Sequence, residues 1–182
     1  MSFLHSLASD DTTLLDIFKM FPETSRPLLA YHELLLRGSS PFTVAERELI
    51  AAYVSGLNAC HYCHGIHRAT AEHFGVPENL LTQLLEEPSL APIDARMQPV
   101  LAFVKKLTLT PSRISPSDAE MVFATGWNDR ALYDAVSVCA LFNFMNRLVE
   151  GVGVKGSPSY FKVSAERLAS DGYLGLQKLL DR

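Results

Sequence analysis

Residues 43–67 read TVAERELIAAYVSGLNACHYCHGIH, and the fold prediction starts from this segment. It opens with a capping box, in which the side chains of Thr43 and Glu46 satisfy free N–H groups at a helix start. Apolar side chains then recur at helical spacing. A C-x-x-C-x-x-x-H pattern follows at residues 60–67. The stretch therefore predicts two consecutive helices, of which the second carries two thiols and an imidazole.

The rest of the chain shows the same helical periodicity and no sustained alternation of the strand type. We expect Pro22 to end a first helix, Ser25 to cap a second, and Gly75 to end the cysteine helix. The fold class is predicted to be all-α, in a single domain over residues 1–182. Its expected parts are a cysteine-bearing core (about 25–90), a second half (about 91–155) and a C-terminal helix (about 159–181), which Gly172 and Gly175 weaken.

The sequence also shows a weak internal similarity. A shift of 83 positions places Cys60 and Cys63 over Asn143 and Asn146, and His67 over Glu150. Either a decayed repeat or a chance match of two apolar helices would explain this internal similarity. The three polar residues then form either a polar helix edge or a buried polar cluster.

Composition excludes several classes of protein. The chain has 182 residues, 48% of them hydrophobic, and a formal net charge of −4 without a Lys/Arg-rich run. We therefore expect no nucleic-acid partner. No uninterrupted apolar run is long enough for a bilayer and no leader is visible, so no membrane association and a cytoplasmic location are expected. Three cysteines are too few for a disulfide scaffold, and a close pair favours redox or metal chemistry.

The cysteine helix has the residues that reversible dithiol chemistry requires. On a helical wheel Cys60, Cys63 and His67 fall within an arc of roughly 60°. His67 lies four residues after Cys63, so its ring can accept the thiol proton. The thiolate can then attack a peroxide, and the sulfenic acid can condense with Cys60 to form a disulfide. An upstream carboxylate can orient the imidazole, and Glu48 is freer for this than the capping-box Glu46.

Three other interpretations of the pattern remain open. Residues 60–64 fit C-x-x-C-H, the attachment motif of haem c, which requires export. Cys60, Cys63, His64 and His67 span about 100°, so three of them, with Glu48, could bind Zn²⁺. The thiols could also be inert core residues, because free cysteine is often buried.

Other notable side chains have simpler explanations. Cys139 lies in an apolar segment and is predicted to be a core residue, and Tyr53 and Trp127 are predicted to pack rather than to bind a substrate. His32 and His73 are predicted to lie on helix surfaces. For His64 a surface position is favoured over a place beside the thiols.

These residues resemble the AhpD-like alkylhydroperoxidase and carboxymuconolactone decarboxylase superfamily. The similarity rests on residues 47–50, residues 58–63 and His67, with twelve positions from Glu48 to Cys60. The tract over residues 141–154 is similar to a later helix of the peroxidase-related branch. The resemblance covers most of residues 25–155.

The resemblance implies an all-helical fold with internal pseudo-symmetry, assembled as dimers, trimers or hexamers. It implies a thiol-dependent peroxidase that acts on a hydroperoxide without a cofactor or metal. By this analogy Cys63 is the peroxidatic thiol, Cys60 the resolving thiol, and Glu48 with His67 the proton relay. The implied reductant is a dihydrolipoyl protein or a similar dithiol carrier. Where the best-known peroxidase has a histidine before the second cysteine, this chain has Tyr62. The alternative function is a redox-sensing or metal-binding helical oligomer.

Overall fold

The computed structural model describes residues 2–88 and 91–180, and the ordered elements of these residues are all helical, as predicted. The α-helices are α1 (Leu14–Met20), α2 (Pro22–Arg37), α3 (Val44–Leu57), α4 (His61–His73), α5 (Leu80–Glu86), α6 (Met97–Leu109), α7 (Pro116–Phe123), α8 (Asp129–Val152) and α9 (Pro158–Leu179). Short 3-10 turns over His5–Leu7 and Pro111–Arg113 precede α1 and α7.

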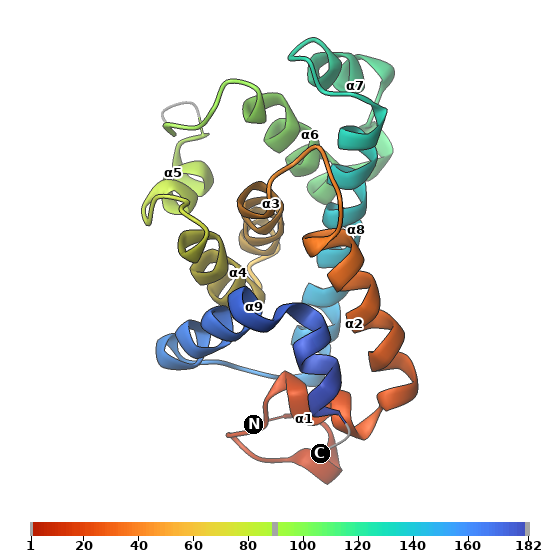
Figure 1. Ribbon diagram of the computed structural model, residues 1–182, viewed down its shortest axis with the longest axis vertical. Coiled ribbons are helices and arrows are strands. Elements are labelled where there is room, and N and C mark those ends of the chain that lie inside the picture. Colours follow the sequence, from red (N-terminus) through yellow and green to blue (C-terminus); the bar gives the residue numbers. More distant parts are fainter. Residues whose placement is uncertain (1, 89–90, 181–182) are drawn as a thin grey trace.

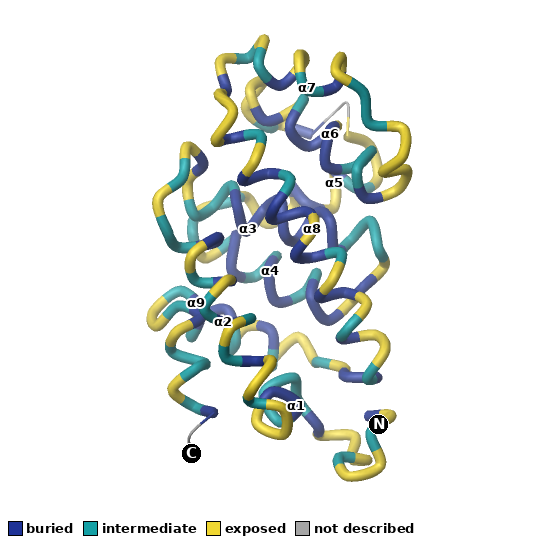
Figure 2. Tube along the Cα trace, turned by 90° about the vertical axis from the view of Figure 1, so that its right-hand side faces the viewer, coloured by how far each residue is buried: buried dark blue, intermediate teal, exposed yellow. Residues whose placement is uncertain are grey.

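The helices surround a central pair, α3 and α8 (Figure 1). Helix α4 folds back along α3, and α9 packs across α4 and α2 at the end of the molecule where both termini lie. Helices α6 and α7 form the opposite end. Burial follows the same arrangement, since α3 is buried along most of its length whereas α7 and the terminal segments are largely exposed (Figure 2). The site residues on α3 and α4 thus lie within the interior.

Helix α8 is long and apolar enough to cross a bilayer by length and composition alone. Half of its most apolar window is buried inside the protein, where it packs against α3 and α6. That is the environment of a core helix, and this composition is weak evidence for a membrane span.

The start of α3 forms as the sequence predicts. The Thr43 hydroxyl accepts a hydrogen bond from the Glu46 amide at 3.2 Å, and the Glu46 carboxylate accepts one from the Thr43 amide at 2.7 Å. One turn later, the buried Arg47 guanidinium donates to the carbonyl oxygens of Leu35 and Gly38 at the end of α2. Glu46 and Arg47 therefore both complete helix ends, which leaves Glu48 as the acidic residue of this turn available to the site.

The prediction for the start of α2 is wrong. Pro22 is the first residue of this helix rather than the end of α1, as its fixed φ allows. Ser25 is therefore not a cap but a buried residue inside the helix, and its hydroxyl donates to the Phe21 carbonyl at 2.8 Å. Pro27 also lies inside α2, within its first two turns.

Cys60 lies just outside the cysteine helix, at its N-cap, with extended backbone angles of −81° and 94°. The chain reverses before it at Ala59, which has a φ of 54°. The helical-wheel argument therefore applies to Cys63 and His67 but not to Cys60. The Cys60 side chain makes no capping hydrogen bond, and its thiol interacts with that of Cys63 from the position just before the helix.

The alignment at a shift of 83 positions places both α3 and α4 over the single helix α8. It places the break between α3 and α4, at residues 58–60, over residues 141–143, which lie in the middle of the continuous α8. Its polar residues nevertheless gather beside the cysteine helix, as described below.

The C-terminal helix is kinked where glycine was expected to weaken it. Gly172 has a φ of 62° inside α9, and a Cβ there would lie 2.6 Å from the Glu33 carboxylate. That carboxylate accepts hydrogen bonds from the amides of Tyr173 and Leu174, so it caps the second half of the helix. The kink directs Tyr173 into the interior, where it becomes part of the site.

Candidate active site

A fully buried carboxylate stands at the centre of the site. Glu48 Oε2 accepts a hydrogen bond from His67 Nδ1 at 2.7 Å. Its Oε1 accepts from Arg37 Nη1 at 2.6 Å and from the Tyr173 hydroxyl at 3.1 Å. The three donors come from α4, α2 and α9. They meet the requirement that a buried charge be paired and hydrogen-bonded.

This arrangement fixes the charge of Glu48 and the tautomer of His67. Burial alone would raise the pKa of the Glu48 carboxyl, but the His67 ring and the Arg37 guanidinium outweigh burial, and the pKa lies below its usual value. Glu48 is thus an acceptor only, so His67 Nδ1 carries the proton toward it. In the neutral ring, Nε2 is therefore left with a free lone pair.

The two thiols are buried and interact with each other. Both are free, with exposed fractions of 0% for Cys60 and 3% for Cys63. A hydrogen bond from the Cys63 thiol, with one from the Cys63 backbone, lowers the pKa of Cys60 even though burial opposes this. The same hydrogen bond and burial raise the pKa of Cys63 well above its usual value. In the reduced protein the negative charge therefore favours Cys60, the N-cap position.

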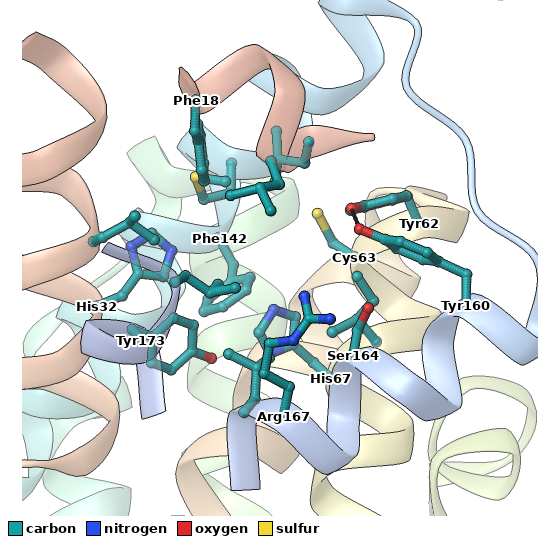
Figure 3. Close-up of a pocket in the computed structure, with 17 residues that line it drawn as sticks. Phe18, His32, Tyr62, Cys63, His67, Phe142, Tyr160, Ser164, Arg167 and Tyr173 are labelled. Atoms are coloured by element: carbon teal, nitrogen blue, oxygen red, sulfur yellow. Dashed lines mark hydrogen bonds between the residues drawn. The ribbon is translucent and has the colours of Figure 1, made fainter. Parts of the chain in front are cut away.

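Cys63 and His67 face one small, mainly apolar cavity of about 80 Å³ (Figure 3). Cys60 does not line it. Phe142 packs edge-on against the His67 ring at 4.4 Å between centroids, and the hydroxyls of Tyr62 and Tyr160 share a hydrogen bond of 2.9 Å. Among the described residues no hydrogen bond joins the Cys63 thiol directly to the His67 ring. A molecule inside the cavity would bridge them.

A polar cluster supports the thiols from the side of α8. Asn58, at the end of α3, donates to the side-chain oxygens of Asn143 and Asn146 at 3.1 and 2.9 Å. Asn146 in turn donates to the Ser55 hydroxyl at 3.0 Å. A hydrogen bond from Asn146 also works against the raised pKa of Cys63. Of the buried cluster envisaged for Asn143, Asn146 and Glu150, only Asn146 is buried, and Asn143 is half-buried. Glu150 is exposed and raises the pKa of Cys60.

The histidine predictions are right for His73, which is exposed, and wrong for His32. His32 is only 3% exposed and lines the cavity, because its Nδ1 donates to the Leu28 carbonyl at 2.8 Å and its ring packs on Tyr173. Burial lowers the pKa of His32 to about 4. His64 is half-buried, with Nδ1 on the Ala52 carbonyl at 2.9 Å, so it is neither a free surface group nor a residue of the cavity.

The predicted packing residues Cys139, Tyr53 and Trp127 are all buried in the core. Sequence reasoning missed Arg37 and Tyr173, which contact Glu48, and Arg167, which lines the cavity. No local motif marks these three residues, and only Gly172 hinted at the bend that brings Tyr173 inward.

Metal binding receives no support from the arrangement of ligands. Within residues 2–88 and 91–180, no group of three or more His, Cys, Asp or Glu side chains is placed to hold a metal ion. Glu48 and His67 face each other, and the two thiols interact with one another rather than with the imidazole.

Comparisons with known proteins agree with this fold. The model of the carboxymuconolactone decarboxylase family matches residues 22–106. An uncharacterized peroxidase-related protein from Silicibacter sp. TM1040 has 30% identity and a TM-score of 0.76, with 81% of this chain and 78% of that chain covered. None of the curated proteins matches.

Two more distant structures share the fold. A peroxidase-related protein with an alkylhydroperoxidase AhpD core, from Ralstonia eutropha JMP134, has 24% identity and a TM-score of 0.75, over 82% of this chain and 78% of that one. A protein of unknown function from Agrobacterium tumefaciens has 18% identity and a TM-score of 0.67, over 80% of this chain and 99% of that one. The chain therefore belongs to the carboxymuconolactone decarboxylase superfamily, in its AhpD-like, peroxidase-related branch.

Proposed function

We propose that this protein is a thiol-dependent hydroperoxide reductase that works through a Cys63–Cys60 disulfide cycle. The observation that carries the proposal is the shared cavity, in which the Cys63 thiol and the His67 ring face the same small space. Cys63 is the attacking thiol because it lines the cavity and Cys60 does not. Glu48 orients the imidazole by holding the proton on Nδ1.

The hydrogen bond between the thiols provides a route to the reactive thiolate. With the charge on Cys60, removal of a second proton from Cys63 would create two adjacent negative charges in a buried site. Transfer of the Cys63 proton to Cys60 instead moves the charge without increasing it. Cys60 thus acts as the base for Cys63. The free Nε2 of His67 then remains available to hydrogen-bond the hydroperoxide.

The reaction then balances in three steps. The Cys63 thiolate attacks the terminal oxygen of R–OOH, the O–O bond breaks, and the leaving alkoxide takes a proton from solvent water to give R–OH and a Cys63 sulfenic acid. This proton returns to solvent when reduction of the disulfide restores the Cys60 thiolate. The Cys60 thiol attacks this sulfenic acid, which forms the disulfide and releases water. An external dithiol reduces the disulfide and becomes oxidised itself. The sum converts R–OOH and a dithiol into R–OH, water and a disulfide.

The buried thiols favour a slender reductant. A disulfide between residues of 0% and 3% exposure has almost no surface of its own, and only its Cys63 side faces the cavity. A dihydrolipoyl group on a flexible arm fits this requirement better than a rigid protein surface.

We place the enzyme in the cytoplasm as part of the same proposal.

We also propose that the chain forms a homo-oligomer, a dimer, trimer or hexamer. Large apolar side chains on two helices support a subunit contact, since Leu34 on α2 is 69% exposed and Tyr133 on α8 is 66% exposed. Light scattering of the purified protein measures the subunit number directly, and a monomer at micromolar concentration would contradict this part of the proposal.

The test is peroxide consumption in the presence of a dihydrolipoyl reductant. The wild type should consume many equivalents of tert-butyl hydroperoxide, and Cys63→Ser should consume none. Cys60→Ser lacks both the base and the resolving thiol, so it should be oxidised once and more slowly than the wild type, to a sulfenic acid trapped by dimedone, and should not turn over. Cys139→Ser is the matched control, because it removes a buried thiol outside the cavity and should retain turnover.

Two outcomes would contradict the proposal. A wild type that is oxidised once and then only changes its oligomeric state would be a redox sensor rather than an enzyme. Sustained turnover of Cys60→Ser with the dithiol would show that Cys60 does not resolve the sulfenic acid.

A further inference from the structure

Arg167 is a cation that lines a mainly apolar cavity. It comes from α9, is half-buried, and lines the same space as Cys63 and His67. Figure 3 shows its guanidinium turned toward the middle of this space, beside Ser164. Among residues 2–88 and 91–180 its side chain has no ion pair and no hydrogen bond.

The other arginines near the site are held by hydrogen bonds within the protein. Arg37 pairs with Glu48 and donates to the Leu168 carbonyl. Arg47 completes the end of α2. The acid closest to the catalytic groups, Glu48, already accepts hydrogen bonds from three donors, so it does not neutralise Arg167. The guanidinium of Arg167 is therefore available to an anion that enters the cavity.

The surroundings of Arg167 define the rest of that ligand. Most of the lining is apolar, and includes Leu14, Phe18, Ile66, Phe142 and Met145. A fully inorganic anion would gain nothing from these side chains, whereas an apolar body would be removed from water. A cavity of about 80 Å³ encloses a short chain or a branched alkyl group, and a longer chain would extend through the mouth.

We propose that Arg167 binds the carboxylate of the substrate, so that the preferred substrates are hydroperoxides of apolar carboxylic acids. This inference rests on the proposed function and adds the substrate class. The planar guanidinium presents two parallel N–H donors that match a carboxylate. The alkyl body occupies the apolar part of the cavity, and the hydroperoxide lies between Cys63 and His67. Arg167 thus acts in binding and orientation, and the thiol chemistry is unchanged.

A pair of substrates that differ only in charge tests the proposal. The probe is a branched hydroperoxide of a short-chain carboxylic acid, supplied as the free carboxylate and as its methyl ester. The wild type should prefer the carboxylate about tenfold or more in kcat/KM, as expected for one charge-assisted pair. Arg167→Gln should bring the ratio close to one, and Arg167→Lys should restore part of it. Arg113→Gln, which removes the same charge from the turn before α7, should leave the ratio as in the wild type.

A binding measurement separates this proposal from the proposed function. Calorimetry with hexanoate and with hexanol requires no turnover. Hexanoate should bind the wild type about tenfold more tightly than hexanol does, and Arg167→Gln should abolish the difference. If hexanoate shows this preference but no peroxide is consumed, the proposed function fails and the carboxylate site stands. If peroxides are consumed while carboxylate and ester react equally in the wild type, the carboxylate site is wrong.

Discussion

Replacement of Glu48 by Gln tests the buried centre of the site most directly. The change keeps the size of the side chain and one oxygen acceptor, but removes the charge and places an NH₂ group against a donor. The NH₂ group then faces either the N–H of His67 or the donors of Arg37 and Tyr173, so one side loses its hydrogen-bond acceptor. In both cases Arg37 keeps a largely buried positive charge without its counter-ion. Breaking such a buried pair costs about 3 kcal/mol at the lower end of its range. That corresponds to a fall in Tm of about 6–12 °C for a chain of this length.

The matched control is Glu46→Gln, the same substitution two positions earlier. Glu46 serves only the exposed capping box, so its replacement should cost about 1 kcal/mol or less. Chemical denaturation of both variants measures the difference in stability. If the proposed function holds, peroxide turnover should fall about a hundredfold in Glu48→Gln but not in Glu46→Gln, because only the first change releases the His67 imidazole.

The pH dependence adds an independent check on Glu48. Its pKa is lower in the folded protein than the usual value of 4.5, so the ionised carboxylate stabilises the fold fully above that value. This contribution is lost as the pH falls through the lowered pKa of the folded state. The stability gap between the wild type and Glu48→Gln should therefore be constant near neutrality and narrow below about pH 4.5. A gap near neutral pH that is no larger than that of Glu46→Gln would refute the buried ion-pair argument.

Three further predictions concern separate parts of the molecule. The pKa of His32 is about 4 in the folded protein against an ordinary value of 6.5, so between these pH values only the unfolded chain takes up a proton. The unfolding free energy of the wild type should therefore fall by up to about 3 kcal/mol from pH 6.5 to 4. Urea titrations at several pH values measure this slope, which His32→Phe should remove. Asn146→Ala removes a hydrogen bond that lowers the pKa of Cys63, so the pH midpoint for Cys63 alkylation by iodoacetamide should rise, and an unchanged midpoint would exclude this role. Gly153→Ala places a Cβ at a φ of 74°, 2.9 Å from the Phe3 ring, and should lower the unfolding free energy by about 1–2 kcal/mol, measured by thermal denaturation.

The cysteine hairpin was predictable because its determinants are local. The capping box, the apolar spacing of α3 and the pattern of residues 60–67 each act within a few turns of helix. The choice of Glu48 over Glu46 also followed from a local competition, since the capping box already occupies Glu46. The same local reasoning failed at Ser25, where a proline that can start a helix was taken for one that ends it. It also failed at Cys60, because a single left-handed residue, Ala59, moves the helix start.

The sequence alone was sufficient to predict the all-helical class, the grouping of the two thiols with the His67 imidazole, and Glu48 as the acid that contacts this imidazole. Only the tertiary structure decided which side chains complete the site, because Arg37, Tyr173 and Arg167 come from helices whose approach depends on packing and on the kink at Gly172. The hydrogen bond from Tyr173 to Glu48 joins residues 125 positions apart. No short-range pattern encodes such a contact, since burial of the same apolar faces is compatible with many side chains at the point where the helices meet.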